Sequence, residues 1–456
     1  MPINKIFYAV ILILLALFTS TYSGCLLGDD IDTIRERAKG GSGGGGGGGG
    51  TEGAPPVPVT GVALNEIELT LGSWETLTAA VVPENATNKA LTWSTSNPAV
   101  AAVNSSGTVT AVKMGSAVIT VTTQDGSYTA ECTVTVPMWT GIPTGDNEGS
   151  AFGNIVIAVN INRIAYGGAA GRQRFVAVGS SGRMAYSDNG VSWTAIPAGT
   201  TQGTTSTFGT TTSINDITYG GGKFVAVGGS GRMAHSDNGV NWTAISAAES
   251  TFTGVPNPDI SGITYENGKF VAVGSSGRMA YSTDGINWTA VINSTFSATI
   301  SGITYGNGRF VAGDGSGKMA YSSDGITWTA VTDSKFGTSN IFGIAYGGAA
   351  GSQKFIAVGW DGKMAYSSDG ITWDAVQDST FVNSIVGITY GNDKFVAVGN
   401  SGRMAYSYDG ESWTAIPSGT DSGTSTFSDA IRGITYGGGR FVAVGAYGRM
   451  AHSVGW

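Results

Sequence analysis

The sequence predicts an all-β protein in which a β-sandwich precedes a seven-bladed β-propeller. An apolar-aromatic stretch, an FVAVG-like strand and a G-[RK]-M-A-[YH]-S strand recur seven times between residues 166 and 450. Repeats of about 40–50 residues with four short strands each are typical of propeller blades. Ahead of them, residues 57–137 alternate apolar and polar residues in short runs separated by Gly, Pro and Asn turns. That pattern is typical of a sandwich.

The FVAVG-like strand anchors each repeat. The anchors begin at Phe175, Phe224, Phe270, Phe310, Phe355, Phe395 and Phe441, and successive anchors lie 40 to 49 residues apart. In the fourth repeat the residue pattern predicts strands over 300–305, 310–313, 318–322 and 328–331. A complete repeat therefore supplies the four strands of one blade.

The two ends of the repeat region predict how the ring closes. The last repeat stops at Trp456 and lacks its outer strand. The W-T-G-I-P segment at 139–143 matches W-T-A-I-P at 193–197, which is the outer strand of the first repeat. We expect residues 139–143 to complete the seventh blade, because an N-terminal strand in that place removes the open sheet edge.

A short polar turn separates the third and fourth strands of most repeats. It reads S-x-[DN]-G-x-x-W at 187–193, 236–242, 282–288, 322–328, 367–373 and 407–413. These turns resemble the Asp-boxes of BNR-type and sialidase-like propellers, with Asn189 and Asn238 at the Asp position in two copies. Ser and Asp or Asn can bond the turn's own backbone, Gly takes a strained angle and Trp packs between blades. We therefore interpret the turns as structural.

Residues 57–137 carry five motifs in order. They are P-E-N-A-T at 83–87, K-A-L-T-W-S at 89–94, S-N-P-A-V-A-A-V at 96–103, G-T-V-T-A at 107–111 and G-S-A-V-I-T-V at 115–121. In these motifs the segment resembles the bacterial Ig-like domain, group 2. The resemblance implies an Ig-like sandwich with Trp93 in its core and a role as a spacer or adhesion module. Cys132 alternates in phase with Val134 and Val136, so we expect it in a core as a small hydrophobe.

The N-terminus has the pattern of a secretory signal, with Lys5 before the apolar run 6–18. This run is too short to span a bilayer comfortably. Residues 1–25 resemble a bacterial lipoprotein signal, which implies lipidation of Cys25, although Tyr22 replaces the usual Leu. The Gly-rich segment 26–56 is expected to be a flexible tether with a reach of about 30 Å.

These features predict the organisation and location of the chain. The domains are a signal peptide at 1–25, a linker at 26–56, the Ig-like domain at 57–137 and the propeller at 138–456. We expect a lipid-anchored protein of the bacterial cell envelope, exposed on the outer membrane or cell surface. A secreted protein is the alternative.

Composition argues against several function classes. A net charge of −8 disfavours nucleic-acid binding, which usually needs a basic excess. His235 and His452 occupy positions held by Tyr in other repeats, so a histidine triad or a zinc site is not expected. We expect a monomer without cofactors or metals.

Two features repeat in every blade. A basic residue ends each second-to-third turn: Arg183, Arg232, Arg278, Lys318, Lys363, Arg403 and Arg449. A Phe lies in each connection: Phe152, Phe208, Phe252, Phe296, Phe336, Phe381 and Phe427. They could form repeated cation-plus-aromatic pockets for glycans or anionic polymers. Perfect repetition favours the alternative, in which Phe fills the gap between blades and the cation bonds neighbouring carbonyls.

Positions that break the repetition are better candidates for a ligand site. Trp360-Asp361 and Tyr447 replace small turn residues, and Asp314 replaces a Gly. Arg163 and Asp216 replace Gly in the I-x-G-I start of the inner strand. The residue before that position also varies: Asn162, Asn215, Ser261, Ser301, Phe342, Val386 and Arg432. We expect these residues around the mouth of the central channel, where aromatic, acidic and Arg side chains suit sugar binding; drift among duplicated blades explains the same pattern.

The sequence argues against an enzyme. Sialidases, which resemble this propeller in their Asp-boxes, need an Arg triad, a Tyr nucleophile backed by Glu and an acidic proton donor. No such set is evident, and Asp216, Asp314 and Asp361 are weak candidates for the two carboxylates of a glycosidase. The sequence therefore favours a non-catalytic module that binds extracellular or host glycans or glycoproteins. A protein-interaction scaffold and a sialidase-like hydrolase are the alternatives.

Overall fold

The computed structural model describes residues 55–67, 69–142, 159–203, 205–246, 251–252, 258–416 and 427–455. The predictions for the signal peptide, Cys25, nearly all of the linker and Phe152 lie outside these residues. The chain forms two compact units, the first mainly of residues up to Met138 and the second mainly of residues from Trp139 onward. Regular structure in the described residues consists of strands and short 3-10 turns, so the all-β prediction is confirmed.

The first unit consists of three small antiparallel sheets. They are β1 (Gly61–Leu64) with β3 (Ala79–Val82), β2 (Trp74–Thr76) with β6 (Thr108–Ala111) and β5 (Ala101–Val103), and β4 (Leu91–Thr95) with β7 (Gly115–Thr123) and β8 (Thr129–Val136). Alternate residues of β7 and β8 point inward, and Ile119 lies opposite Cys132 in their register. Cys132 is buried in the core, as the residue pattern predicted. Trp93 is only partly buried and packs against that core from its edge.

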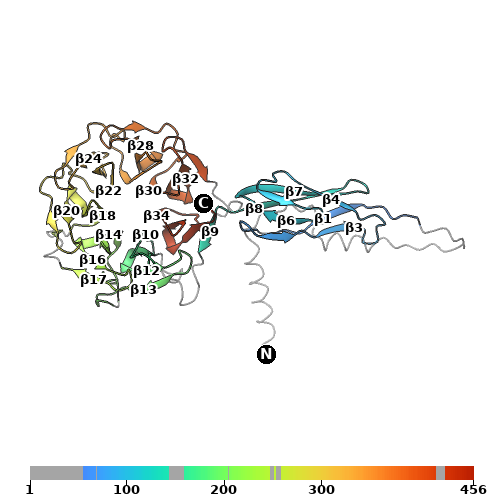
Figure 1. Cartoon of the computed structure of the whole chain (residues 1–456), viewed down its shortest axis with the longest axis horizontal. Helices are drawn as coiled ribbons and strands as arrows, with labels where there is room; N and C mark the ends of the chain where they lie inside the picture. Colours follow the sequence, from blue (N-terminus) through green and yellow to red (C-terminus); the bar gives the residue numbers. More distant parts are fainter. Residues whose placement is uncertain are drawn as a thin grey trace, which may run out of the picture. The chain divides into compact units, whose positions relative to one another are not determined.

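The second unit is an array of seven four-stranded antiparallel sheets within the described residues. Each sheet is called a blade here, numbered in chain order (Figure 1). Blade 1 has β10 (Ile161–Gly167), β11 (Arg174–Gly179), β12 (Met184–Ser187) and β13 (Thr194–Ile196); blade 2 has β14 (Ile214–Gly220), β15 (Lys223–Gly228), β16 (Met233–Ser236) and β17 (Thr243–Ile245); blade 3 has β18 (Ile260–Glu266), β19 (Lys269–Gly274), β20 (Met279–Ser282) and β21 (Thr289–Ala290). Blade 4 has β22 (Ile300–Gly306), β23 (Arg309–Asp314), β24 (Met319–Ser322) and β25 (Thr329–Ala330); blade 5 has β26 (Ile341–Gly347), β27 (Lys354–Gly359), β28 (Met364–Ser367) and β29 (Asp374–Ala375). Blade 6 has β30 (Ile385–Gly391), β31 (Lys394–Gly399), β32 (Met404–Ser407) and β33 (Thr414–Ile416); blade 7 has β34 (Ile431–Gly437), β35 (Arg440–Gly445), β36 (Met450–Ser453) and β9 (Trp139–Ile142).

The FVAVG-like strand is buried on both of its faces because each face meets a neighbouring blade. Successive side chains of a strand point to opposite faces of the sheet. In blade 1, Val176 and Val178 join a cluster with Phe224 of blade 2. Phe175 and Ala177 join another cluster with blade 7 residues. A run of five apolar residues is therefore what a blade needs to pack on both sides.

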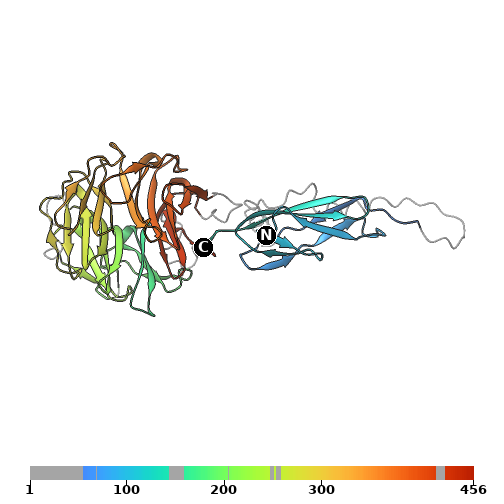
Figure 2. The same ribbon diagram turned by 45° about the horizontal axis from the view of Figure 1, so that its top comes forward.

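The first strands of the blades form the inside of the array, with β10 beside both β14 and β34 (Figures 1 and 2). β9, the first strand of the second unit, pairs with β36, the last strand of that unit. Ile142 lies opposite Met450 and Trp139 opposite Ser453 in an antiparallel register. Trp139 is only 1% exposed. The segment that precedes all the repeats thus provides the fourth strand of blade 7.

A search of the described residues for a helix long and apolar enough to cross a membrane found none.

Candidate ligand-binding face

The strand pairing divides the turns of each blade between two faces. In blade 1, Ile161 at the start of β10 lies opposite Gly179 at the end of β11. The start of each inner strand and the turn between the second and third strands therefore lie together, on what we call the connection face. The S-x-[DN]-G turns and the turns between the first and second strands lie on the opposite face, which we call the box face.

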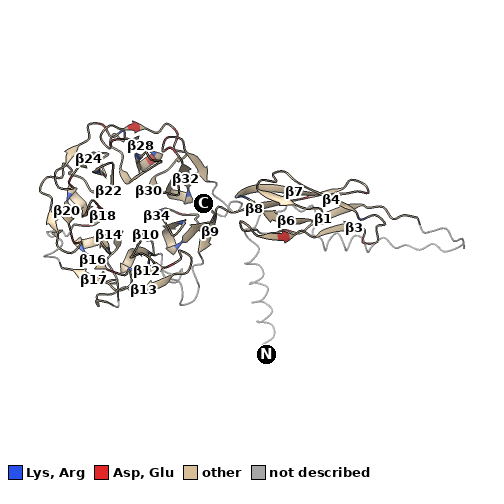
Figure 3. Cartoon of the chain, viewed as in Figure 1, with Lys and Arg blue, Asp and Glu red and all other residues tan. Residues whose placement is uncertain are grey.

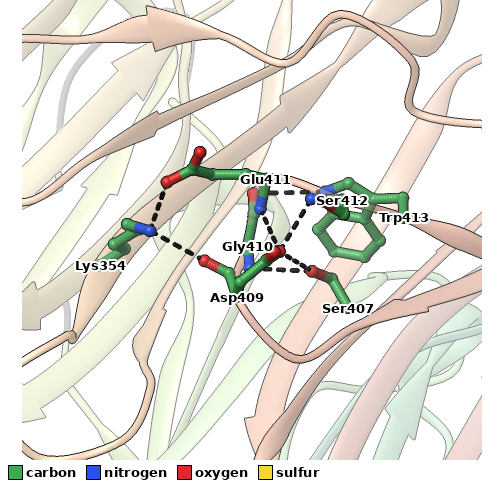
Figure 4. Close-up of polar contacts among 7 residues, drawn as sticks. All are labelled: Lys354, Ser407, Asp409, Gly410, Glu411, Ser412 and Trp413. Atoms are coloured by element: carbon green, nitrogen blue, oxygen red, sulfur yellow. Dashed lines mark hydrogen bonds and ion pairs between the residues drawn. The ribbon is translucent and has the colours of Figure 1, made fainter.

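The S-x-[DN]-G turns bond themselves. In blade 6, Asp409 Oδ1 accepts hydrogen bonds from the backbone N–H groups of Glu411 and Ser412, both at 2.8 Å (Figure 4). The N–H of Gly410 donates to Ser407 Oγ at 2.8 Å, and Gly410 has a positive φ of 77°. Asn189 of blade 1 accepts the corresponding bonds at the same distances. These side chains are occupied in holding the turn, as the residue pattern predicted.

A second set of basic residues, on the box face, was not anticipated. The residue immediately before each anchor Phe is basic: Arg174, Lys223, Lys269, Arg309, Lys354, Lys394 and Arg440. Lys354 of blade 5 donates to the carbonyl of Asp409 in blade 6 at 3.1 Å (Figure 4). Lys223 and Lys269 make the same bond to Asp284 and Asp324 of the next blade. The repetition of this residue was visible in the sequence, but its partner is a backbone atom.

Many of these cations also pack on a tyrosine of their own blade. Arg174 lies 5.0 Å from the centroid of the Tyr186 ring, and Lys354 lies 5.5 Å from that of Tyr366. Lys269 and Lys354 therefore join the third strand of their own blade to the turn of the next one, whereas Arg174 pairs with Asp188 in the turn of its own blade. Such contacts between a cation and an aromatic face are attractive.

A Tyr and a Glu do lie together on the box face. Lys354 Nζ forms an ion pair of 2.5 Å with Glu411 (Figure 4). The Glu411 carboxylate also acts on Tyr366. Desolvation and the Glu411 carboxylate raise the pKa of Tyr366. The Glu411 carboxylate is already paired with Lys354 in this arrangement.

On the connection face, the repeated Phe residues are packing residues. Phe208, Phe252, Phe336, Phe381 and Phe427 are buried. The repeated cations lie nearby. Arg232 donates to the carbonyl of Phe208, and Lys363 to that of Phe336. The hypothesis of repeated cation-plus-aromatic pockets is wrong for these Phe side chains, because a ligand cannot reach them.

Two of the predicted acidic residues are engaged by the fold. Asp314 is fully buried, and it accepts hydrogen bonds from the backbone N–H groups of Ser316 and Lys318. It holds the turn between β23 and β24, and its carboxylate is occupied by these backbone bonds. Asp216 accepts bonds from the N–H groups of Ile217 and Ile263 through its two carboxylate oxygens. Burial raises the pKa of Asp216, and Arg163 opposes that shift.

Several residues at the start of the inner strands tie adjacent blades together. Asn162 donates to the carbonyl of Ile214 and Asn215 to that of Ile260, both at 2.9 Å. Ser261 bonds Ile300 of blade 4 in the same way. Each of these residues lies at a register shift between the first and third residues of its strand, which takes it out of the ladder. Variation at this position is therefore partly variation in how blades are joined.

The remaining candidates are accessible. Trp360 is 50% exposed and stacks on Phe342, with ring centroids 6.5 Å apart and planes at 26°. Asp361 follows it and is exposed. Tyr447 is 51% exposed at the equivalent turn of blade 7. Asp361 and Tyr447 have positive φ values of 54° and 56°, as Ser does in the same place elsewhere. This turn geometry presents the side chains of the second turn residue outward in blades 5 and 7.

Arg163 and Arg432 meet between blades 1 and 7. Arg163 Nη1 donates to the backbone carbonyl of Arg432 at 2.5 Å and to that of Asn162 at 2.9 Å. Charged residues of the unit are otherwise spread around the array rather than collected in one place (Figure 3). Within the described part of the chain, no group of three or more His, Cys, Asp or Glu residues could hold a metal ion.

Comparison with known proteins identifies part of the first unit. Residues 58–134 match the Bacterial Ig-like domain (group 2) family. Similar proteins include an uncharacterized protein of Clostridium acetobutylicum, 48% identical over 73 residues (16% of this chain and 8% of that protein). An alpha-L-arabinofuranosidase of Bifidobacterium longum is 48% identical over 77 residues (17% and 7%). An Ig-like virion protein of Serratia phage KSP90 is 44% identical over 86 residues (18% and 33%). The chain spans at most a third of the length of these relatives.

Solved structures resemble the chain in fold. YCF48 from Cyanidioschyzon merolae matches with a TM-score of 0.50 at 17% identity, over 69% of this chain and 98% of that one. Virginiamycin B lyase from Staphylococcus aureus matches with a TM-score of 0.51 at 10% identity, over 65% and 98%. At these identities the likeness shows a shared propeller-like fold and carries no information about activity.

Proposed function

We propose that this chain is a surface-anchored bacterial lipoprotein whose second unit is a seven-bladed Asp-box propeller, closed by β9, that binds carbohydrate without catalysis. In this proposal Cys25 carries the lipid, residues 26–56 form the tether and the Ig-like domain is a spacer. The ligand is an extracellular or host glycan or glycoprotein. The protein acts as a monomer.

The observation that carries the proposal is the exposed aromatic pair Trp360 and Phe342 on the connection face. Half of the Trp360 surface is accessible, and Phe342 stacks beneath it. A rigid aromatic face of this kind suits the apolar face of a sugar ring, and Asp361 beside it can accept hydrogen bonds from hydroxyl groups. Blade 5 differs here from the other blades, so packing of the repeat does not require these residues.

The comparisons support a surface location and leave the ligand open. The matches to the arabinofuranosidase and the virion protein named above cover only the Ig-like domain of this chain. The partial matches also include a lacto-N-biosidase of Bifidobacterium bifidum, 41% identical over 90 residues. A protein that carries such a domain beside a propeller fits an extracellular binding module.

The test is a glycan array probed with the full-length protein in mild detergent, followed by titration of the best glycan. Trp360→Ala is expected to weaken binding at least tenfold, or about 1.4 kcal/mol. Tyr408→Ala is the matched control, because Tyr408 is an exposed aromatic (65%) in the S-x-D-G turn of blade 6 on the box face. It should leave affinity within twofold.

Three results would contradict the proposal. Absence of binding to any glycan, together with specific capture of a protein, would favour the scaffold alternative. Equal losses of glycan affinity in Trp360→Ala and Tyr408→Ala would show that Trp360 is not the binding site. Hydrolysis of a bound glycan that is abolished by Asp361→Asn would favour the hydrolase alternative.

A further inference from the structure

Two arginines of adjacent blades lie side by side on the connection face. Arg163 belongs to β10 of blade 1 and Arg432 to β34 of blade 7, and these inner strands are neighbours. Arg163 reaches back to the main chain of Arg432, since its Nη1 donates to that residue's carbonyl. This bond brings the Arg163 guanidinium to the backbone of Arg432, and the two positive side chains are close enough for their charges to interact.

Within the described residues, the positive charges of Arg163 and Arg432 are not both balanced by carboxylates. Arg163 has a carboxylate in its surroundings, because its charge acts on Asp216 of blade 2. Among the residues that the structure describes, no carboxylate acts on Arg432, and its pKa is lowered by burial and then by the charge of Arg163. The Nε atom of Arg432 is buried and has no hydrogen-bond partner among the described residues. Leaving a half-buried cation unpaired is costly, so an anionic partner would stabilise it.

The fold itself does not require an arginine here. At the same position Asn162, Asn215 and Ser261 bond the backbone of the following blade, and Phe342 packs under Trp360. The side chain of Arg432 makes no such bond in the described residues. Its backbone carbonyl accepts the hydrogen bond from Arg163. The arginine side chain is therefore available to a ligand.

We propose that Arg432 and Arg163 form a site for an oxyanion, either carboxylate or sulfate, carried by an acidic polysaccharide. The planar guanidinium matches the geometry of both anions and can bind them through two parallel hydrogen bonds. Tyr447, half exposed on the turn Ala446–Gly448 that lies against β10, offers a ring face beside the charged pair. The inference rests on the proposed function only in naming a carbohydrate as the carrier of the anion.

The test measures binding of three polymers to the full-length protein by titration calorimetry at low ionic strength. Polygalacturonate presents carboxylates, dextran sulfate presents sulfates and dextran is neutral. We expect at least one acidic polymer to bind tenfold or more tightly than dextran, with an affinity that falls as salt is added. Preference between the two acidic polymers identifies which oxyanion the site takes.

Two substitutions assign the binding to this site. Arg432→Gln should weaken the preferred acidic polymer at least tenfold. Arg172→Gln removes an equal charge from the exposed turn between β10 and β11, on the box face, and should change affinity less than twofold. The thermal midpoint without polymer should not fall in Arg432→Gln, because the unpaired cation and its repulsion of Arg163 are lost.

Equal affinities for dextran and both acidic polymers would overturn the site, as would equal losses in the Arg432 and Arg172 variants. A lower midpoint of Arg432→Gln without polymer would also overturn it, since that result would assign the side chain to stability. These outcomes leave the proposed function untouched if a neutral glycan still binds through Trp360. Conversely, a midpoint raised by galacturonate or inorganic sulfate in the wild type, but not in Arg432→Gln, supports the oxyanion site even where no glycan polymer binds.

Discussion

Replacing Trp139 by Ala tests how much of the second unit depends on β9. Trp139 is 1% exposed and begins the strand that pairs with β36. The substitution removes nearly the whole contact of a buried indole. Truncating a buried Trp or Phe to Ala typically costs about 3–5 kcal/mol. That is a large part of the roughly 5–15 kcal/mol by which native proteins are stable.

This loss converts into a measurable shift of the thermal midpoint. Unfolding entropy is about 2.1 cal/mol/K per residue near 60 °C, which gives about 0.6 kcal/mol/K for a unit of roughly 300 residues. A loss of about 3–5 kcal/mol then lowers the midpoint by about 5–8 °C. Differential scanning calorimetry of the full-length protein measures the transition directly.

The matched control is Trp74→Ala, which removes the same side chain from β2 in the first unit. Trp74 is 69% exposed, so its loss should shift neither transition by more than about 1 °C. The Trp139 variant should also be cleaved faster by protease near its C-terminal strand, because β36 loses its partner. Equal midpoints for the wild type and the Trp139 variant would refute the view that β9 stabilises blade 7.

Three further predictions concern single side chains. Asp324→Asn should cost no more than about 1 kcal/mol at pH 7, because Asn189 makes the same turn bonds and the exposed carboxylate is screened. Desolvation opposes ionisation of Asp324, but backbone and side-chain hydrogen bonds outweigh it and lower the pKa from 3.8 to about 2. The stabilisation from the ionised carboxylate is therefore lost between about pH 4 and 2. The urea midpoints at pH 7 and 3 should differ less in Asp324→Asn than in the wild type. Burial lowers the pKa of His452, and the charge of Arg440 adds to this shift. The unfolded chain therefore binds more protons, so wild-type stability falls as the pH drops below about 6.5. His452→Tyr should abolish that slope in thermal scans from pH 8 to 5, and an unchanged slope would contradict this. Asp314→Ala leaves the N–H groups of Ser316 and Lys318 without their acceptor and should cost about 2–3 kcal/mol in urea unfolding; a cost below about 0.5 kcal/mol would show that the turn does not need it.

The sheets were predictable because the signals for them are local. The alternation within Phe175–Gly179 states which side chains face each neighbouring blade, and the S-x-[DN]-G turns carry their own hydrogen-bond donors and acceptors. The match of residues 139–143 to an outer strand likewise needed only the sequence. These features require no knowledge of distant backbone atoms.

The candidate site was less predictable because backbone atoms are its main partners. Arg163 and Asp216 break the repeat as a ligand site would, yet each bonds the main chain of a neighbouring blade. Side-chain identity does not encode which distant carbonyl or N–H group a residue will meet. Lys354 was overlooked for the same reason, although its position before the anchor Phe was constant. Trp360 stays a candidate because half of its surface is exposed, even though its ring stacks on Phe342.

The bonds from Lys223, Lys269 and Lys354 all run from one blade to the next in chain order. Each blade therefore has a donating side and an accepting side, which is the head-to-tail type of interface seen in cyclic assemblies. An interface of this kind has no inherent stopping point, and it yields a closed ring only when the rotation between units divides a full turn. The pairing of β9 with β36 adds a covalent condition, because the chain must return to its first strand. A ring with one blade more or fewer could keep the same contacts between adjacent blades. It would need a different rotation angle at every interface.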